Sequence, residues 1–373
     1  MTGQQFGRQT DHMSGQQTDQ QSGRQTCPQA DCRTDRARGA LVGLAIGDAL
    51  GMPTQMMSRE RIRELVGTLT GFVPAPAENE ISSGTAAGRV TDDTDQAIIM
   101  GSMLVEGHGR VDQQELARRL LAWQETMKRV GSADLLGPST RRALEAVRSG
   151  VPAGESGRWG DTNGAAMRVA PVGIAVPPDP LGRLADVVAD VGRVTHNTSI
   201  ANAGAAAVAA VVSAGVDGAN PEQAAMTGIA AARLGARRGH YVAGADVAAR
   251  IAWARDLVRD ATGDPLDLVY SVVGTGVATQ EAVPAAFALV RLYADDPWRA
   301  CLAAAGLGGD SDTVAAMTGA MLGACHGMAA FPDAAIETLM AANPGIGLVA
   351  LADQLLCLRD QVAEVGVPVA TAP

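Results

Sequence analysis

Helical spacing dominates this 373-residue sequence from Ala37 onward. Apolar residues recur there at intervals of three and four, which is the spacing of one buried helix face. Alternating runs of β-branched and aromatic residues, which would indicate half-buried strands, are nearly absent. The fold class that this pattern predicts is all-α. The helices are expected over the ranges 37–50, 95–106, 113–130, 181–195, 201–215, 222–235, 245–259, 281–293, 312–330 and 348–364.

A single compact domain is expected over residues 37–373. Hydrophobic residues make up 47% of the chain, which is enough for a large core. Glycine and proline gather between the expected helices, as connecting loops require. The loop over 71–90 is longer than connections usually are, which favours a functional role for it.

Residues 1–36 have a different composition. They are rich in Gln, Gly and Thr in a nearly repeated order, and they carry few apolar side chains. Such a segment cannot bury enough apolar surface to offset the entropy that it would lose on ordering. We therefore expect a disordered, Gln-rich tail that ends at residue 36.

The net charge limits the expected partners. The 40 acidic residues outnumber the 30 basic ones, which gives −10 at pH 7. Nucleic-acid binding depends on neutralising phosphates with Lys and Arg, so no nucleic-acid partner is expected. The early apolar run over 41–52 contains Asp48 and is too short for a bilayer, which needs ~20 apolar residues. With no visible secretory signal, we expect a cytoplasmic protein with no membrane partner.

Two short segments gather carboxylates and hydroxyls near the starts of expected helices. They are Thr91-Asp92-Asp93-Thr94-Asp95 and Asp310-Ser311-Asp312-Thr313. Oxygen donors of this kind suit Mg²⁺, Mn²⁺ or Ca²⁺ better than zinc. If folding joined the segments, their five carboxylates would repel one another, and two metal ions ~3.5–4 Å apart would balance the charge. The alternative is that each segment only caps its helix, because Asp, Ser and Thr are favoured at helix starts.

Five segments, taken in order, resemble the ADP-ribosylglycohydrolase family. They are GALVGLAIGDALGMP from Gly39, VTDDTDQA from Val90, NGAAMRVAPVG from Asn163, THNT from Thr195 and GLGGDSDTVAAMTGAMLGACHG from Gly306. Each is weak alone, but the five in this order are specific. The resemblance implies an all-α domain with a dinuclear metal site that binds two divalent ions, commonly Mg²⁺ or Mn²⁺. It also implies removal of ADP-ribose from arginine, serine or another acceptor, or cleavage of a related riboside.

The resemblance also implies roles for individual residues. The implied metal ligands are Thr91, Asp92 and Asp93 for one ion, Asp310 and Thr313 for the other, and Asp312 for both. The implied catalytic residues are Asp93, Asp312 and Gln55. The implied substrate-binding residues are Asn163, Gly164 and His196. For His196, a buried and hydrogen-bonded core histidine is an equal alternative.

Gln55 departs from the family's pattern. Many members carry a glutamate at this position, which positions or deprotonates the attacking water. A glutamine can orient a water but cannot accept its proton at neutral pH. Either metal-bound hydroxide suffices, or another carboxylate takes the role, with Asp48, Glu78 and Glu80 as the candidates.

A second departure lies in Gly274-Thr275-Gly276-Val277. Members that bind ADP-ribose often carry an aromatic residue after the matching glycines, and Val277 offers no ring for stacking on adenine. Trp159 is the nearest aromatic candidate in the sequence. Arg168 could pair with a phosphate or form a structural ion pair.

The predicted function is metal-dependent hydrolysis of the C1 glycosidic bond of an ADP-ribosyl or related ribosyl substrate. The expected partner is an ADP-ribosylated protein or a ribosylated small molecule. Three alternatives stay open: a glycohydrolase of nucleosides or ribosyl metabolites, a non-catalytic binding or structural protein, and a metal-dependent phosphohydrolase.

Overall fold

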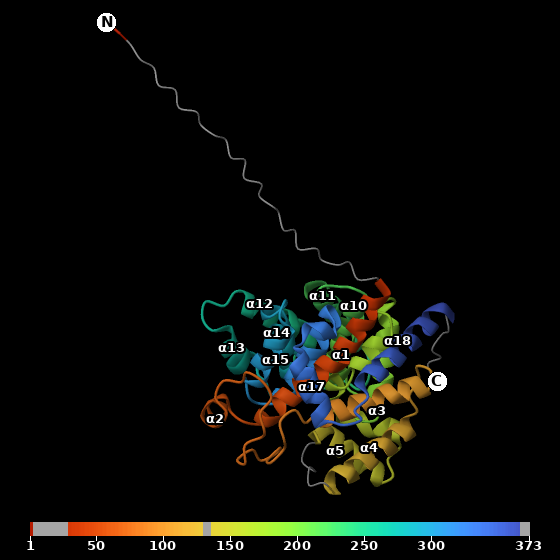
Figure 1. Cartoon of the computed structure of the whole chain (residues 1–373). Coiled ribbons are helices and arrows are strands. Elements are labelled where there is room, and N and C mark those ends of the chain that lie inside the picture. The colour runs from red at the N-terminus through yellow and green to blue at the C-terminus, as the bar shows by residue number, and fades with distance from the viewer. Residues whose placement is uncertain (3–28, 130–135, 366–373) are drawn as a thin grey trace.

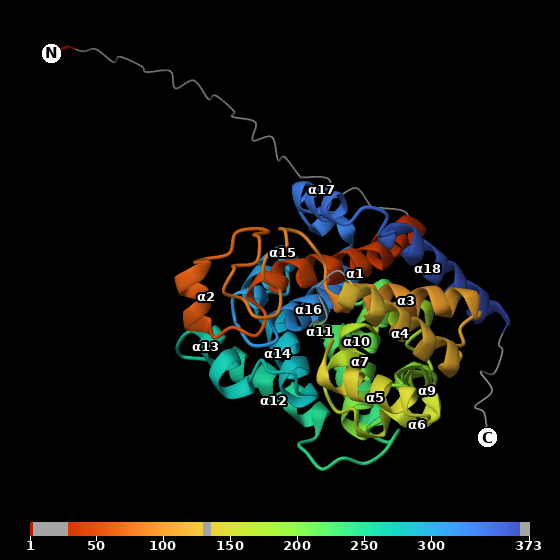
Figure 2. The same cartoon turned by 90° about the horizontal axis from the view of Figure 1, so that it is seen from below.

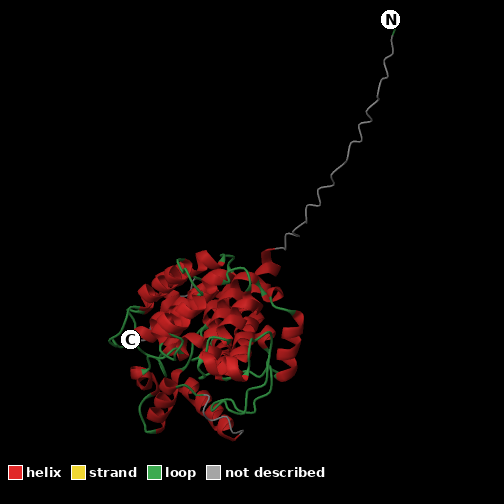
Figure 3. Cartoon of the chain, turned by 90° about the vertical axis from the view of Figure 1, so that its left-hand side faces the viewer, coloured by secondary structure: helices red, strands yellow, loops and turns green. Residues whose placement is uncertain are grey.

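The structure, a computed structural model, describes residues 1–2, 29–129 and 136–365. These residues form helices joined by loops, and the only β-type pairings among them are three isolated bridges (Figure 1, Figure 3). The all-α prediction is confirmed. The longer helices are α1 (Gln29–Gly51), α3 (Asp92–Glu106), α4 (Gln113–Arg129), α5 (Pro138–Arg148), α9 (Leu181–Gly192), α10 (Ser199–Val216), α11 (Pro221–Gly235), α12 (Val247–Arg259), α14 (Thr279–Leu292), α15 (Pro297–Ala305), α16 (Ser311–His326), α17 (Asp333–Ala342) and α18 (Leu348–Val365).

Shorter helical turns complete the chain between these helices. They are η1 (Met52–Thr54), α2 (Arg59–Leu65), α6 (Ala153–Ser156), η3 (Gly157–Trp159), α7 (Gly164–Met167), α8 (Ala170–Ala175), α13 (Pro265–Leu268), η4 (Val269–Val273, a π-helix) and η5 (Met328–Ala330). The helices α2, α5, α15 and α17 were not among the expected ranges. They are short and lie beside proline- or glycine-containing loops, where a periodic apolar pattern has little length in which to appear.

Helix α10 is the centre of the core. Every residue from Ile200 to Val216 is buried, and α8, α9, α11, α14 and α16 pack around it (Figure 2). Ser199–Val216 has the length and apolar composition of a membrane span, but 94% of it is buried by the rest of the protein. A helix that is apolar on all sides and covered by its neighbours is explained by its place in the core.

A stripe of glycines joins α1 to α16. Gly39, Gly43, Gly47 and Gly51 lie four residues apart on α1 and face the backbone of α16. A Cβ atom on Gly47 would overlap the carbonyl group of Ala315, and one on each of the other three would overlap backbone as well. These glycines therefore let two helix backbones touch, and they set the position of α16 relative to α1.

The predicted end of the tail at residue 36 is wrong. Helix α1 begins at Gln29, so residues 29–36 are helical, whereas residues 3–28 of the predicted tail lie outside the described residues. Arg33 contributes to this order, since it pairs with Asp217 after α10 and with Asp360 on α18. Polar pairing of this kind leaves no apolar periodicity in the sequence.

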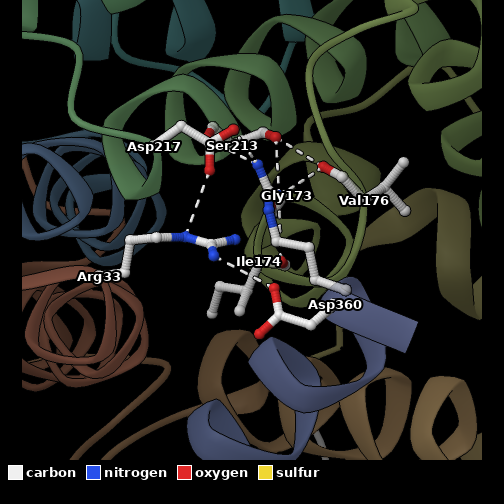
Figure 4. A network of polar contacts seen from close by, with 8 residues as sticks. Arg33, Gly173, Ile174, Val176, Ser213, Asp217 and Asp360 are labelled. Carbon is white, nitrogen blue, oxygen red and sulfur yellow. Dashed lines mark hydrogen bonds and ion pairs between the residues drawn. The ribbon is translucent and has the colours of Figure 1, made fainter. Parts of the chain in front are cut away.

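Helix α18 is tied to the core by a buried arginine. The Arg359 side chain is almost fully buried, and it donates to the carbonyl oxygens of Gly173, Ile174 and Val176 near the end of α8. It also donates to Ser213 and to the Asp217 carboxylate, beside the end of α10 (Figure 4). One side chain thus satisfies the open carbonyl groups of two helix ends.

Candidate active site

The two acidic segments meet at one cleft. Helix α3 starts at Asp92 and α16 starts at Ser311, and the Thr313 hydroxyl donates to Asp93 Oδ1 at 3.3 Å. More than 200 residues of chain separate these segments, so only the fold brings them together. The residues that line the cleft are Gln55, Asp92, Asp93, Gly137, Pro138, Thr140, Thr162, Asn163, Gly164, Met167, Val277, Asp310, Asp312 and Thr313.

Asp48 organises the start of α3 and does not line the cleft. It is fully buried and accepts hydrogen bonds from the backbone N–H and hydroxyl groups of both Thr91 and Thr94. Burial raises the pKa of its carboxyl to about 6, although these hydrogen bonds act in the opposite direction. Because its oxygens are already occupied, the candidacy of Asp48 as catalytic base is not supported.

The other two candidate bases also lie elsewhere. Glu78 and Glu80 are exposed on the loop between α2 and α3 and are absent from the cleft lining. The same loop does have a role at the site, because Asn79 donates to the carbonyl oxygens of Pro53 and Gln55. The loop therefore holds the segment that presents Gln55 to the cleft.

The helix-capping alternative holds for one segment only. Thr91 is the N-cap of α3 and accepts from the Asp93 N–H at 3.4 Å, while its hydroxyl donates to Asp48. Of the six predicted metal ligands, Thr91 is the one that does not line the cleft. Asp310 precedes α16 without capping it, and its carboxylate accepts from the Asn163 amide instead.

Some carboxylate oxygens buried at the cleft have no hydrogen-bond donor among the described residues. Asp92, Asp93, Asp310 and Asp312 are each 9% exposed or less. Burial, with repulsion from neighbouring carboxylates, raises the pKa of Asp93 and Asp312 well above the ordinary value. Asp93 Oδ2 and Asp312 Oδ1 are buried and accept no hydrogen bond from the described residues.

These unpartnered oxygens suit a hard divalent cation. Carboxylates buried without partners are costly, and a cation that binds them removes both the desolvation cost and the mutual repulsion. Within the described part of the chain, no group of three or more His, Cys, Asp or Glu side chains is gathered as a metal site by itself. The donors that the cleft lining offers are the carboxylates and the Thr313 hydroxyl beside them.

Asn163 and Gly164 also line the cleft, and the Asn163 amide contacts the Asp310 carboxylate. The Asn163 backbone N–H donates to the Val277 carbonyl oxygen at 3.0 Å, which joins the start of α7 to the loop before α14. Gly164 packs against the ring of His196, and a Cβ atom there would lie 2.7 Å from His196 Cε1. A side chain at this position would therefore collide with the His196 ring.

His196 does not reach the cleft, so its predicted substrate contact is corrected. It is fully buried behind Gly164, with Nδ1 against Thr195 Oγ1 and Nε2 against Thr162 Oγ1. His196 is thus a buried and hydrogen-bonded core histidine, the alternative considered for it from the sequence. Arg168 is also buried and donates to Gln96 and Thr195, so it belongs to the layer beneath the cleft and pairs with no phosphate there.

The outer part of the cleft opens past Gln55 and Val277. It has a volume of about 420 Å³ and is also lined by Met56, Ile81, Leu136 and residues of α5. No aromatic side chain is among the described residues that line either part. Trp159 is 60% exposed outside this lining, and its ring lies under the Arg158 guanidinium, so it does not supply the missing ring.

Sequence reasoning missed part of the wall. Gly137, Pro138 and Thr140 at the start of α5, and Thr162 before Asn163, all line the cleft. A signal for the first group existed, because a Gly-Pro-Ser-Thr sequence is typical of a helix start. Thr162 carried no signal beyond its position next to the Asn163-Gly164 turn.

These features define a class of protein: an all-helical protein with an acidic cleft between two helix starts. The sequence model of the ADP-ribosylglycohydrolase family matches residues 28–365, and the chain belongs to this family. The resemblance seen in the five sequence segments is confirmed.

Individual relatives agree with this assignment. The YegU protein of Escherichia coli K12 is 37% identical over 313 residues, covering 83% of this chain and 93% of that protein. ADP-ribosylarginine hydrolase Tri1 of Pseudomonas putida is 29% identical over 310 residues, covering 81% and 74%. A solved structure described as an ADP-ribosylglycohydrolase-related protein complex matches with a TM-score of 0.61 and 25% identity, covering 88% and 99%. The chain is a hydrolase of a family that acts on ADP-ribosyl linkages.

Proposed function

We propose that this protein releases ADP-ribose from an ADP-ribosylated acceptor, using two divalent ions, Mg²⁺ or Mn²⁺. The observation that carries the proposal is the pair of buried oxygens, Asp93 Oδ2 and Asp312 Oδ1, which have no hydrogen-bond partner in the described chain. They face a cleft in a protein whose family hydrolyses ADP-ribosyl linkages. The arginine-directed activity named for the relative Tri1 supports a protein side chain as the acceptor.

The chain offers a defined set of groups for this reaction. The residues that would hold the ions are Asp92, Asp93, Asp310, Asp312 and Thr313, with Thr91 behind them. Bound there, the ions would supply Lewis-acid contact to the ribose hydroxyls and lower the pKa of the attacking water. Asn163 restrains the Asp310 carboxylate through its amide, which fixes one side of this set.

Gln55 contributes orientation and not proton transfer. Its amide lies in the wall of the cleft and donates to the Met52 carbonyl oxygen at 3.3 Å. An amide can hold a water in place but does not take its proton at neutral pH.

A second candidate function is the cleavage of a smaller nucleoside or ribosyl metabolite. The observation that favours it is the cleft lining, where Val277 stands at the family's aromatic position and no described residue supplies a ring. Stacking on adenine is worth ~0.5–1.5 kcal/mol beyond area burial, so its loss weakens the case for an adenine-containing substrate.

A product assay separates the two functions. Purified protein is incubated with Mg²⁺ or Mn²⁺, with and without chelator, against ADP-ribosyl-arginine, ADP-ribosyl-serine and a panel of nucleosides, and products are read by mass spectrometry. Chelator-sensitive release of ADP-ribose supports the first function, and release of a free base supports the second. Turnover that survives full chelation would contradict the metal dependence of both.

A variant pair links the activity to the cleft. Asp312→Asn removes a carboxylate of the cleft at nearly constant volume, and we expect at least a ~100-fold loss of kcat with the fold retained. The matched control is Asp256→Asn on the exposed face of α12, which should leave kcat unchanged. Equal activity of both variants would show that the reaction does not occur at this cleft.

A further inference from the structure

A chain of hydrogen bonds begins at the acidic side of the cleft and runs beneath it. Gln96 Nε2 donates to Asp92 Oδ2 at 2.8 Å, and Arg168 Nη1 donates to Gln96 Oε1 at 2.5 Å. Gln96 and Arg168 are 1% and 2% exposed. The chain therefore starts at a carboxylate of the cleft and enters the core.

The same chain returns to the lining of the cleft at Thr162. Arg168 Nη2 donates to Thr195 Oγ1, which lies 2.8 Å from His196 Nδ1. His196 Nε2 in turn lies 3.1 Å from Thr162 Oγ1. Thr195 and His196 are fully buried, whereas Thr162 is half-buried and lines the cleft.

The direction of each hydrogen bond follows from the arginine. A guanidinium only donates, so Thr195 Oγ1 accepts from Arg168 and must place its own proton elsewhere. Among the described residues, the one further partner of this hydroxyl is His196 Nδ1. Since a buried hydroxyl proton without an acceptor is costly, Thr195 donates and His196 Nδ1 accepts.

The histidine then has one tautomer available. Burial, together with the positive charge of Arg168, lowers the pKa of His196 well below its ordinary value, so the ring is neutral. A neutral ring that accepts at Nδ1 carries its proton on Nε2. That N–H donates to Thr162 Oγ1, which leaves the proton of the Thr162 hydroxyl to point away from the ring.

We propose that Thr162 is a substrate-binding residue whose hydroxyl is held as a hydrogen-bond donor toward an oxygen of the ribosyl substrate in the cleft. Arg168, Thr195 and His196 are the positioning residues that fix this direction. The ligand part of the inference rests on the proposed function, whereas the tautomer part does not. A fixed donor favours ligand groups that accept, such as a ribose oxygen or a phosphate oxygen, over groups that only donate.

The first test measures binding of ADP-ribose by calorimetry in the presence of Mg²⁺. Thr162→Val keeps the shape of the side chain but removes the hydroxyl, and we expect about five- to tenfold weaker binding. Thr162→Ser restores the hydroxyl and should bind within about threefold of the wild type. Melting temperatures of the three proteins should agree within about 2 °C, which would separate a ligand contact from a structural role.

The second test reads the tautomer directly by NMR of the ¹⁵N-histidine-labelled protein. His196→Gln identifies the His196 ring signals among those of the five histidines. We expect a neutral ring protonated on Nε2 at pH 7. Thr195→Val removes the donor to Nδ1, and we expect the tautomer preference to weaken in that variant.

The outcomes separate the inference from the proposed function. A His196 ring that is protonated on Nδ1, or charged at pH 7, would overturn the direction assigned to Thr162. Wild-type and Thr162→Val proteins that bind ADP-ribose equally would overturn the ligand contact and leave the proposed function standing. A wild type with no affinity for ADP-ribose would count against the proposed function and against this ligand, while the NMR result would still decide the tautomer.

Discussion

Asp93 and Asp312 show at the scale of single residues what the cleft demands of a ligand. Each has a buried oxygen with no donor among the described residues and a carboxyl pKa raised by burial and by its neighbours. A group with a raised pKa keeps its proton in the folded state after the unfolded chain has released it. The free energy of unfolding therefore falls as the pH rises from the ordinary value of ~4 through the folded-state pKa values.

This sign gives a prediction for the metal-free protein. Its melting temperature should fall between pH 4.5 and pH 7.5, because burial raises the pKa of Asp48 to about 6, and burial with repulsion between carboxylates raises the pKa values of Asp93 and Asp312 well above the ordinary value. Saturating Mg²⁺ or Mn²⁺ should raise the melting temperature by several degrees at pH 7.5, since binding at 100 times Kd contributes ~2.7 kcal/mol. At pH 4.5 the same ions should have little effect. Scanning calorimetry across this pH range makes the comparison.

Asp312→Asn serves as the control for that prediction. It removes one buried charge, so the metal-free protein should be more stable than the wild type at pH 7.5 and less responsive to Mg²⁺. If the melting temperature of the wild type changed neither with pH nor with divalent ions, the assignment of the cleft as a cation site would be contradicted.

At the scale of elements, the glycine stripe of α1 sets where the first turn of α16 lies relative to α1. Gly51 lies against the backbone of Ser311 and Asp312, so the close contact of the two helices extends to the wall of the cleft. The glycines of the segment GALVGLAIGDALG thus serve the packing of α1 on α16. Asp48 is the residue in it that supports the site chemically, through Thr91 and Thr94.

Gly47→Ala tests the role of this contact. The added Cβ would overlap the Ala315 carbonyl group, which is backbone and cannot rotate away. We expect the free energy of unfolding to fall by ~1–3 kcal/mol, measured by urea denaturation, with a loss of activity as α16 shifts. Gly182→Ala in α9 is the matched control, because a Cβ atom there meets nothing within 4 Å. It should be neutral or stabilise by ~0.5–1 kcal/mol, and equal losses in both variants would refute the packing argument.

At the scale of the whole molecule, Arg359 connects the last helix to the core. Its partners belong to the ends of α8 and α10, which are otherwise separate in the chain (Figure 4). Helix α18 also packs on α3, whose first residues form the acidic cleft. Helix α18 thus packs on the helix that begins at the cleft.

Arg359→Ala should destabilise the protein by ~2–5 kcal/mol, because it leaves several buried carbonyl groups without a donor. The matched control is Arg38→Ala. Arg38 also joins α18, through Asp353, but both side chains are more than a third exposed, so ~0–1 kcal/mol is expected. Urea denaturation followed by circular dichroism measures both. Similar losses of unfolding free energy in the two variants would show that the buried network stabilises the protein no more than the exposed ion pair does.

The sequence by itself determined the helical class, because apolar spacing reports which face of each segment must be buried. It also determined the chemistry of the cleft, since the residue types Asp92, Asp93, Asp310 and Asp312 define the donors wherever they lie. It placed the start of the ordered chain too late, because residues 29–36 are held by ion pairs and not by an apolar face.

Only the tertiary structure decided which groups face the cleft. It placed His196 behind Gly164 and brought Thr162 into the wall of the cleft. It also directed the Asp48 carboxylate to hydrogen bonds with two threonines and away from the cleft. The periodicity of a sequence reports burial along one element at a time. Which polar side chain meets which partner depends on contacts between segments that can be more than 200 residues apart, and these exist only once the helices have packed.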